Sequence, residues 1–389
     1  MSDETLDTLP PLPLPDGIRA RYIDGNNGLR MHVLEAGHET PGNDAPERPM
    51  VLLLHGFPEL AFSWRRIMPA LAAAGYHVVA PDQRGYGRTS AHRVAFDDDL
   101  APYRMLNLVR DALGLVRAFG REKVHAVVGH DFGSFVAAWA AVTRPDVFRS
   151  VALMSAPFAG VPKIPFGTAA AGNAARAVDP VHDDLAALPR PRKHYQWYYS
   201  THAAASHMDA PRQGLHDFLR AYYHHKSADW TANRPHPLTA WSAAELAKLP
   251  TYYVMDLEET MPETVAHEMP SPPEIAACRW LPDAELAVYA AEYARTGFQP
   301  SLNWYRCKTT ARFGGELELF DGRTIDVRSC FIAGASDWGI HQTAGAFEKM
   351  QEEVLTDMRG CHLVDGAGHW VQQEQPEATI RLLLDFVGR

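Results

Sequence analysis

An aspartate at a glycine-framed turn is the feature of this sequence that most directly indicates chemistry. Asp131 lies within residues 127–134 (VVGHDFGS), between a short apolar run and a helical pattern. The spacing Gly-x-Asp-x-Gly matches a turn that presents a nucleophile between a buried strand and a helix. A serine there would attack a carbonyl carbon, whereas a carboxylate is suited to attack a saturated carbon, opening a strained ring or expelling a halide. Asp131 therefore predicts an alkyl-enzyme ester rather than acyl transfer, with a plain helix cap as the simpler alternative.

Two further residues stand where partners of Asp131 are expected. His369 lies in a glycine-containing loop, residues 365–370 (DGAGHW), between a short predicted strand and the last helical pattern. Asp337 follows another predicted strand, and a carboxylate there can orient a histidine and stabilise its protonated form. The order nucleophile, acid, histidine along the chain is a known order for such triads. We therefore predict Asp131 as nucleophile, Asp337 as acid and His369 as base.

A fourth turn predicts how negative charge on a reaction intermediate is stabilised. Residues 55–58 (HGFP) follow a fully apolar predicted strand. The backbone N–H groups of Phe57 and Phe132 would converge on one point and form an oxyanion hole. A tight strand–helix turn without this role is the simpler interpretation of the same motif.

The elements that must position these residues alternate between strand and helix. The predicted strands cover residues 19–24, 29–35, 50–54, 76–80, 124–128, 150–154, 327–333 and 362–364. The predicted helices of the same regions cover residues 62–74, 105–119, 132–142, 345–355 and 376–387. Such alternation indicates parallel crossovers and an α/β fold with a mostly parallel, doubly wound sheet.

The middle of the chain breaks this alternation. Helical patterns appear there without intervening strands, at residues 212–225, 242–249 and 283–293. We therefore expect an N-terminal arm at 1–17, an α/β core at 18–155 and 310–389, and a helical lid inserted at 156–309.

The overall composition excludes several classes of function. The chain has 389 residues, 46% of them hydrophobic, and a formal net charge of −10, with no basic cluster that would indicate nucleic acid. Its four cysteines form no C-x-x-C pair, and its histidines match no compact set of metal ligands. The first 15 residues lack a signal-peptide pattern, and no apolar run is long enough to span a membrane. We expect a cytoplasmic protein without metal, and the sequence leaves its oligomeric state open, a homodimer included.

Together these motifs resemble those of epoxide hydrolases with an α/β-hydrolase fold. The matching segments are residues 55–59 (HGFPE), 63–65 (SWR), 82–87 (DQRGYG), 129–133 (GHDFG) and 368–370 (GHW). The resemblance implies that water is added to a small epoxide through a covalent aspartyl ester, giving a vicinal diol. It implies no metal or organic cofactor, and it makes Pro58 and Trp370 candidate substrate contacts.

The same resemblance extends into the lid. Residues 302–306 (LNWYR), preceded by 296–298 (TGF), resemble the segment that carries the family's second lid tyrosine. By this likeness Tyr305 is a phenol that protonates the ring oxygen as the epoxide opens. Residues 194–199 (HYQWYY) resemble the segment of the first lid tyrosine, which would make Tyr195 its partner.

The choice of the first phenol stays open at this level. Tyr198 and Tyr199 are rivals of Tyr195, and Ser200 stands where the family commonly has glutamine. Trp197, in the same aromatic run, is a candidate substrate contact, but packing of the lid on the core is an equally good role.

Two other functions use similar residues. A haloalkane or haloacid dehalogenase can use the same aspartate, but Phe132 lacks the indole N–H that commonly binds halide after the nucleophile. Phe57 likewise stands where many haloalkane dehalogenases have asparagine, and residues 132–135 contain no arginine to hold a haloacid. A non-catalytic binding protein of the same fold is the third hypothesis, and the presence of every expected reactive group argues against it.

Overall fold

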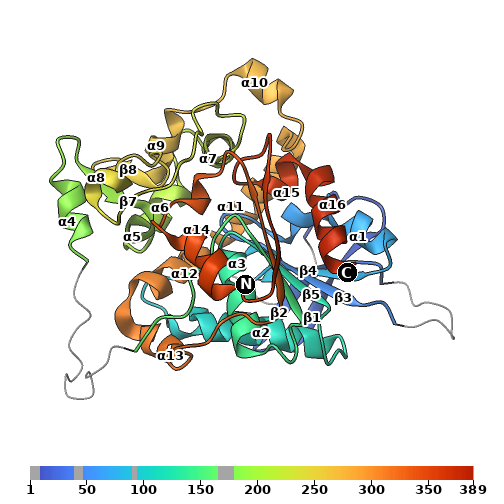
Figure 1. Ribbon diagram of the computed structural model, residues 1–389. Coiled ribbons are helices and arrows are strands. Elements are labelled where there is room, and N and C mark those ends of the chain that lie inside the picture. The colour runs from blue at the N-terminus through green and yellow to red at the C-terminus, as the bar shows by residue number, and fades with distance from the viewer. Residues whose placement is uncertain (1–8, 39–46, 90–93, 165–178, 389) are drawn as a thin grey trace.

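The fold is built on one eight-stranded sheet. The computed structural model describes residues 9–38, 47–89, 94–164 and 179–388 (Figure 1). In spatial order the strands are β1 (Ile18–Asn26), β2 (Leu29–Ala36), β4 (His77–Pro81), β3 (Met50–Leu54), β5 (Ala126–His130), β6 (Ser150–Met154), β9 (Arg328–Gly334) and β10 (Met358–Val364). β2 runs antiparallel to both β1 and β4, and every neighbouring pair from β4 to β10 is parallel. The predicted α/β fold with a mostly parallel sheet is confirmed.

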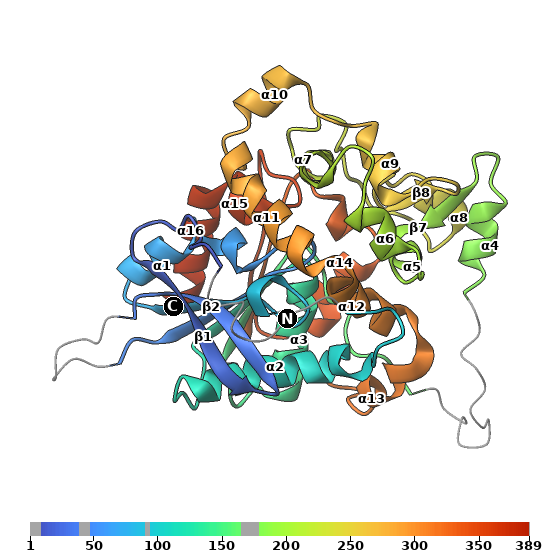
Figure 2. The same ribbon diagram turned by 180° about the vertical axis from the view of Figure 1, so that it is seen from behind.

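Helices cover both faces of this sheet, as the continuous apolar runs of its strands require. The core helices are α1 (Met68–Ala73), α2 (Met105–Ala118), α3 (Phe132–Thr143), α14 (Ala346–Lys349), α15 (Val371–Glu374) and α16 (Pro376–Val387). Successive strand residues enter different hydrophobic clusters: Val127 packs in the cluster of α2 and α3, and Val128 in that of α1 and α16. Figures 1 and 2 show these two helical layers on opposite sides of the strands.

A helical segment lies between β6 and β9. Its elements are α4 (Val181–Ala186), β7 (Arg192–His194), α5 (Tyr195–Tyr199), α6 (Ala204–Asp209), α7 (Leu215–Lys226), α8 (Ala243–Leu246), β8 (Val254–Asp256), α9 (Met261–Ala266), α10 (Pro272–Ala277), α11 (Asp283–Thr296), α12 (Gln299–Thr309) and α13 (Gly314–Glu318). Figure 1 shows most of this segment, in green to orange, stacked above the sheet. Its helix α12 packs on the core, because Tyr305 and Trp304 contact the ring of Phe132.

Several elements differ from the prediction in extent. The predicted helix 62–74 is a 3₁₀ turn, Ala61–Trp64, followed by α1, which starts at Met68 because Pro69 fits only the first turn of a helix. The predicted helix 345–355 continues beyond α14 as a π-helix, Met350–Val354. The middle segment also contains a small antiparallel sheet, β7 with β8, that the sequence did not indicate.

The other 3₁₀ helices of the described residues are Gly87–Thr89, Ala101–Tyr103, Ala311–Phe313 and Trp338–Ile340. Residues 1–8 of the predicted arm and 165–178 of the predicted lid lie outside the described residues. The domain limits at 17, 155 and 309 stay predictions. Among the described helices, none combines the length and apolar character that a bilayer crossing requires.

Candidate active site

The predicted reactive residues follow the carboxyl ends of parallel strands. Asp131 comes directly after β5, and Phe57 three residues after β3, which pairs with β5. Asp337 comes three residues after β9, and His369 five residues after β10. Strands of a parallel sheet end at a common edge, where open α/β folds bind their ligands. The topology therefore gathers four segments that are far apart in the sequence.

The turn at Asp131 is sharp and conformationally costly. Asp131 has φ 53° and ψ −120°, a backbone conformation that residues other than glycine rarely adopt. A side chain at Gly129 would collide with the backbone of Gly133, and one at Gly56 would collide with the Asp131 side chain. The two glycines thus allow β5, α3 and the turn after β3 to approach closely around the carboxylate.

Asp131, His369 and Asp337 lie within hydrogen-bonding reach of one another. His369 Nε2 is 3.2 Å from Asp131 Oδ2, and His369 Nδ1 is 3.1 Å from both carboxylate oxygens of Asp337. Asp337 Oδ1 also accepts the backbone N–H of Gly339 at 2.6 Å, which fixes the carboxylate. All three side chains are buried. The arrangement can hold a histidine between a nucleophile and an orienting acid.

The site favours the ionised form of Asp131. Burial acts to raise the pKa of Asp131, but the hydrogen bond and charge of His369, with the charges of Lys226 and His130, outweigh it. They hold the pKa of this carboxyl well below its usual range. The pKa of Asp337 is also lowered, because His369 and the Gly339 N–H outweigh the effect of burial. Both carboxylates are therefore charged at neutral pH.

One backbone donor already points at the carboxylate. The N–H of Phe57 donates to Asp131 Oδ1 at 2.9 Å. Phe132 is the first residue of α3, and the N–H groups of a first helical turn have no acceptor within the helix. These two groups are the predicted oxyanion donors: the first bonds the Asp131 carboxylate, and the second belongs to the residue that follows Asp131 in the chain.

Two buried tyrosines of the helical segment between β6 and β9 lie near enough to Asp131 for its charge to act on them. Tyr305 in α12 packs edge-on against the rings of Phe57 and Phe132, at 5.5 Å and 5.3 Å between ring centroids. The Tyr195 ring, at the start of α5, lies 6.0 Å from that of Tyr305. Burial first, and then the negative charge of Asp131, raise the pKa of both phenols well above 10. Both hydroxyls are therefore neutral donors over the whole physiological range.

The hydroxyl environments separate Tyr195 from its rivals. Tyr195 OH donates to Gln342 Oε1 at 3.1 Å and accepts from Gln196 Nε2 at 3.0 Å. Tyr198 OH instead lies 3.0 Å from His207 Nδ1, and Tyr199 OH donates to Tyr222 OH at 3.3 Å. After burial, the charge of Asp131 is the leading cause of the raised pKa of Tyr195, and Tyr195 stays the predicted first phenol.

The predicted substrate contacts have other visible partners. Pro58 follows a cis peptide bond, and its carbonyl accepts the hydroxyl of Tyr223 at 3.2 Å. Trp370 is fully buried, and its indole N–H donates to the Tyr223 carbonyl at 2.8 Å. The Trp197 ring packs against those of His182 and His194. Contact of these three residues with substrate stays a prediction, and for Trp197 the visible contacts favour packing within the helical segment between β6 and β9.

The structure also shows charged residues at the site that the motifs did not indicate. Lys226, at the end of α7, is only 3% exposed, and its ammonium lies 5.0–5.8 Å from four ring centroids, those of Tyr222, Tyr252, Tyr253 and Trp370. Burial lowers the pKa of Lys226, while the charges of Asp131, Asp337 and Glu59 oppose this. Lys226 was not predictable, because its segment shows no pattern that links it to the sheet edge.

A buried pair, His130 and Glu59, supports the loop that carries His369. His130 Nδ1 contacts Glu59 Oε2 at 2.5 Å, and His130 Nε2 lies 2.7 Å from the carbonyl oxygen of His369. Both ring nitrogens face acceptors, which favours the protonated ring, and the charge of Glu59 overcomes burial to raise the pKa of His130. Glu374 accepts the backbone N–H groups on either side of His369, from Gly368 and Trp370, at 2.9 Å each.

No group of three or more His, Cys, Asp or Glu side chains among the described residues is arranged to hold a metal ion.

Comparison with known proteins shows the family to which the chain belongs. Residues 49–376 match the family model of the alpha/beta hydrolase fold. The chain is 33% identical over 380 residues to epoxide hydrolase B of Mycobacterium tuberculosis, covering 93% of this chain and 96% of the relative. It superimposes on an epoxide hydrolase from an endophytic Streptomyces with a TM-score of 0.72 and 32% identity, over 96% of each chain. Epoxide hydrolase A from Mycobacterium thermoresistibile gives a TM-score of 0.69 at 31% identity, over 95% of this chain and 98% of that one.

The fold and the family model show that the chain is a hydrolase of the α/β-hydrolase fold. Within that class, the chain belongs to the epoxide hydrolase family.

Proposed function

We propose that this chain hydrolyses an epoxide to a vicinal diol through a covalent ester on Asp131. The observation that carries the proposal is the pairing of an ionised carboxylate, Asp131, with two buried neutral phenols, Tyr305 and Tyr195. Ring opening needs a charged nucleophile and a neutral proton donor at the same time. The opposite pKa shifts of these groups supply both at neutral pH.

In the first half-reaction, a carboxylate oxygen of Asp131 attacks a ring carbon. The C–O bond to that carbon breaks, and the ring oxygen takes a proton from the phenol of Tyr305 or Tyr195. The other phenol donates a hydrogen bond to the same oxygen, and water later restores the lost phenol proton. An alkoxide is a poor leaving group, so this proton transfer is what allows the C–O bond to break.

In the second half-reaction, water cleaves the ester. Alkylation removes the Asp131 charge that faces His369 Nε2, so this nitrogen becomes free to accept a proton from water. The hydroxide attacks the ester carbonyl, and the N–H groups of Phe57 and Phe132 stabilise the oxyanion by about 3–4 kcal/mol each. Asp337 stabilises the imidazolium, which returns its proton to the departing diol oxygen. Asp131 is released as a carboxylic acid, and its proton passes through water to the phenolate, so that the carboxylate and the phenol both reform.

The same proposal assigns roles to the larger parts of the chain. Residues 18–155 and 310–389 form the catalytic core, and residues 156–309 form the lid that supplies the two phenols. Epoxide and water are the only reactants, and no cofactor takes part. A cytoplasmic location and a homodimer remain predictions from the sequence.

A dehalogenase is the main alternative, and the hydrogen bonds at the site argue against it. The indole N–H groups of Trp304 and Trp370, which border the site, donate to backbone carbonyls of Arg84 and Tyr223. They are thus engaged rather than directed at a halide. Phe57 and Phe132 offer only their backbone N–H groups.

Parallel assays with epoxides and alkyl halides separate the alternatives. We expect diol formation from a panel of terminal and internal epoxides, with no halide release from matched alkyl chlorides and bromides. Asp131→Asn, which keeps the shape of the nucleophile, should lose the activity. Halide release without diol would establish the dehalogenase, and turnover of neither class would favour a binding protein.

A further inference from the structure

The loop that carries the base, residues 365–370, lies directly against the end of α7. The N–H of His369 donates to the Lys226 carbonyl at 2.9 Å. A side chain at Gly368 would collide with the backbone of residues 226–228, so the two segments are in close backbone contact. The position of this base loop therefore depends on the helical segment between β6 and β9.

One carboxyl group joins the base loop to α7. Glu374, the last residue of α15, accepts the N–H groups of Gly368 and Trp370 at 2.9 Å each and that of Ala228 at 2.8 Å. Gly368 and Trp370 flank His369, whereas Ala228 lies two residues beyond α7 and 146 residues from Glu374 in the chain. The bond from Trp370 is a local cap of α15, but the bond from Ala228 ties together distant parts of the fold.

Glu374 holds the backbone of the base loop rather than the reacting groups. His369 Nε2 is 3.2 Å from Asp131 Oδ2, and His369 Nδ1 is 3.1 Å from both carboxylate oxygens of Asp337. The aspartates follow the strands β5 and β9, so the sheet fixes them independently of α15. A displacement of the base loop would change the distances of the imidazole to both carboxylates.

The tie needs oxygen acceptors rather than a full charge. Burial raises the pKa of Glu374 to about 8, while the N–H groups of Ala228, Gly368 and Trp370 act to lower it. A protonated carboxyl keeps its carbonyl oxygen as an acceptor with two lone pairs, so the tie persists on both sides of this pKa. A buried N–H without an acceptor costs free energy, so removal of the side chain should release the base loop from α7.

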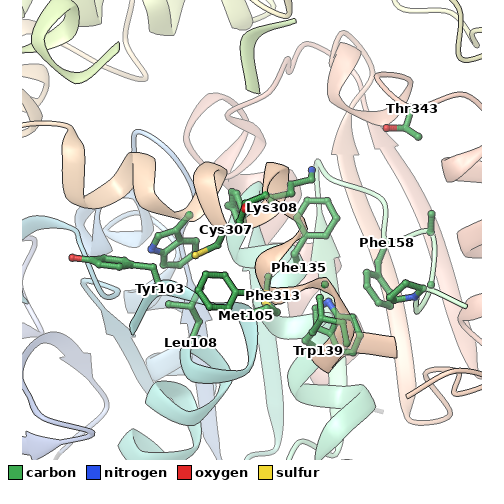
Figure 3. Close-up of a pocket in the computed structure, with 18 of the residues that line it drawn as sticks. Tyr103, Met105, Leu108, Phe135, Trp139, Phe158, Cys307, Lys308, Phe313 and Thr343 are labelled. Carbon is green, nitrogen blue, oxygen red and sulfur yellow. The ribbon is translucent and has the colours of Figure 1, made fainter. Parts of the chain in front are cut away.

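The phenol of Tyr305 is supported in another part of the molecule. Its ring packs on that of Phe132, which with Trp304 also lines an apolar cavity of about 300 Å³ between α2, α3, α12 and α13 (Figure 3). Among the described residues that line this cavity, neither Glu374 nor any of its three donors occurs. The loss of the Glu374 side chain should therefore leave Tyr305 in place.

We propose that Glu374 is a positioning residue of the second half-reaction, which sets His369 for proton transfer by tying the base loop to the end of α7. The inference rests on the proposed function. In ring opening Asp131 attacks and a phenol donates, so His369 moves no proton. In ester hydrolysis His369 Nε2 must take a proton from water, and a misplacement of about 1 Å can cost about 100-fold in rate. An error in its position should thus slow the second step and spare the first.

Rapid-quench single turnovers of the full chain with styrene oxide test this assignment. Glu374→Ala removes all three acceptors, so ester hydrolysis should slow by about 10- to 100-fold and ester formation by less than about threefold, and the alkyl-enzyme should accumulate. Glu374→Gln keeps one oxygen for at most two donors, so it should slow ester hydrolysis by only about three- to tenfold. Glu377→Gln removes an exposed carboxylate at the start of α16 and should leave both rates as in the wild type.

A double variant separates positioning from a general loss of structure. His369→Gln removes the base and leaves only a slow residual decay of the ester. Adding Glu374→Ala should slow this decay by less than about twofold, because a residue that acts through His369 then has nothing to position.

Three results would overturn the assignment. They are equal slowing of ester formation and ester hydrolysis, unchanged ester hydrolysis in the Glu374 variants, and a loss in the double variant as large as that of Glu374→Ala alone. If Glu374→Ala does not fold, Glu374→Gln decides between the same outcomes. An absence of ester in the wild type would instead count against the proposed function.

Discussion

Replacing Tyr305 with phenylalanine removes one hydroxyl and leaves the ring that packs on Phe57 and Phe132. Tyr305 and Tyr195 are only 3% and 4% exposed, so bulk water has little access to take the place of the lost donor. A buried donor to a developing oxyanion is worth about 3–4 kcal/mol, which corresponds to about 10²–10³ in rate. We therefore expect the rate of ester formation to fall by about that factor. Ester hydrolysis uses His369 and backbone N–H groups, so it should change by less than about threefold.

Single-turnover kinetics separate these two steps. Excess enzyme is mixed rapidly with styrene oxide and quenched, and the alkyl-enzyme and diol are quantified against time. Tyr198→Phe is the matched control, since its hydroxyl bonds His207 and its loss should leave ester formation unchanged. Tyr195→Phe should resemble Tyr305→Phe, and the double variant should form almost no ester. Equal slowing of both steps, or a loss of only a few fold, would refute the reasoning about the phenols.

Three further predictions concern the charges of the site. Lys226→Met removes a buried cation near Asp131, Asp337 and Glu59, so the pKa of Asp131 should rise. The acid limb of the pH profile of ester formation should then move up by about one pH unit or more, and Lys226→Arg should reverse much of this shift. An acid limb that does not move in Lys226→Met would contradict the role of the lysine. Because the pKa values of Tyr195 and Tyr305 lie well above 10, the rate of ester formation should stay level as pH rises to about 10. A decline of this rate centred near the ordinary phenol pKa of about 10 would show that the phenols are solvated. His369→Gln keeps a donor beside Asp131 but removes the base, so intact-protein mass spectrometry should find one substrate added to Asp131, and an unmodified protein would contradict the assigned base.

The sequence predicts most of the core because its reactive residues are tied to strand ends. Asp131, Phe57, Asp337 and His369 each follow an apolar run within a few residues, and parallel strands bring such positions to one edge. Their hydrogen bonds could not be predicted, because these depend on the positive φ of Asp131 and on the close approach that Gly56 permits.

The helical segment between β6 and β9 is less predictable, since the main sheet does not fix its register. Tyr305 was identified through its resemblance to a family segment, and the choice of Tyr195 over Tyr198 rests on the hydroxyl contacts of the folded chain. Lys226 and Gln342 carry no motif at all. Their proximity to the site follows from how α7 and the turn after β9 pack, which periodicity does not encode.

Isotope labelling in a single turnover tests the central claim, that Asp131 forms and then loses an ester. Excess enzyme converts styrene oxide in H₂¹⁸O, and the diol and the peptide that contains Asp131 are analysed by mass spectrometry. The mechanism predicts that water-derived ¹⁸O enters the Asp131 carboxylate, while the diol of this first turnover receives its new oxygen from the enzyme and stays unlabelled. Label in the diol with none in Asp131 would mean that water attacks the epoxide directly, and it would contradict the covalent route.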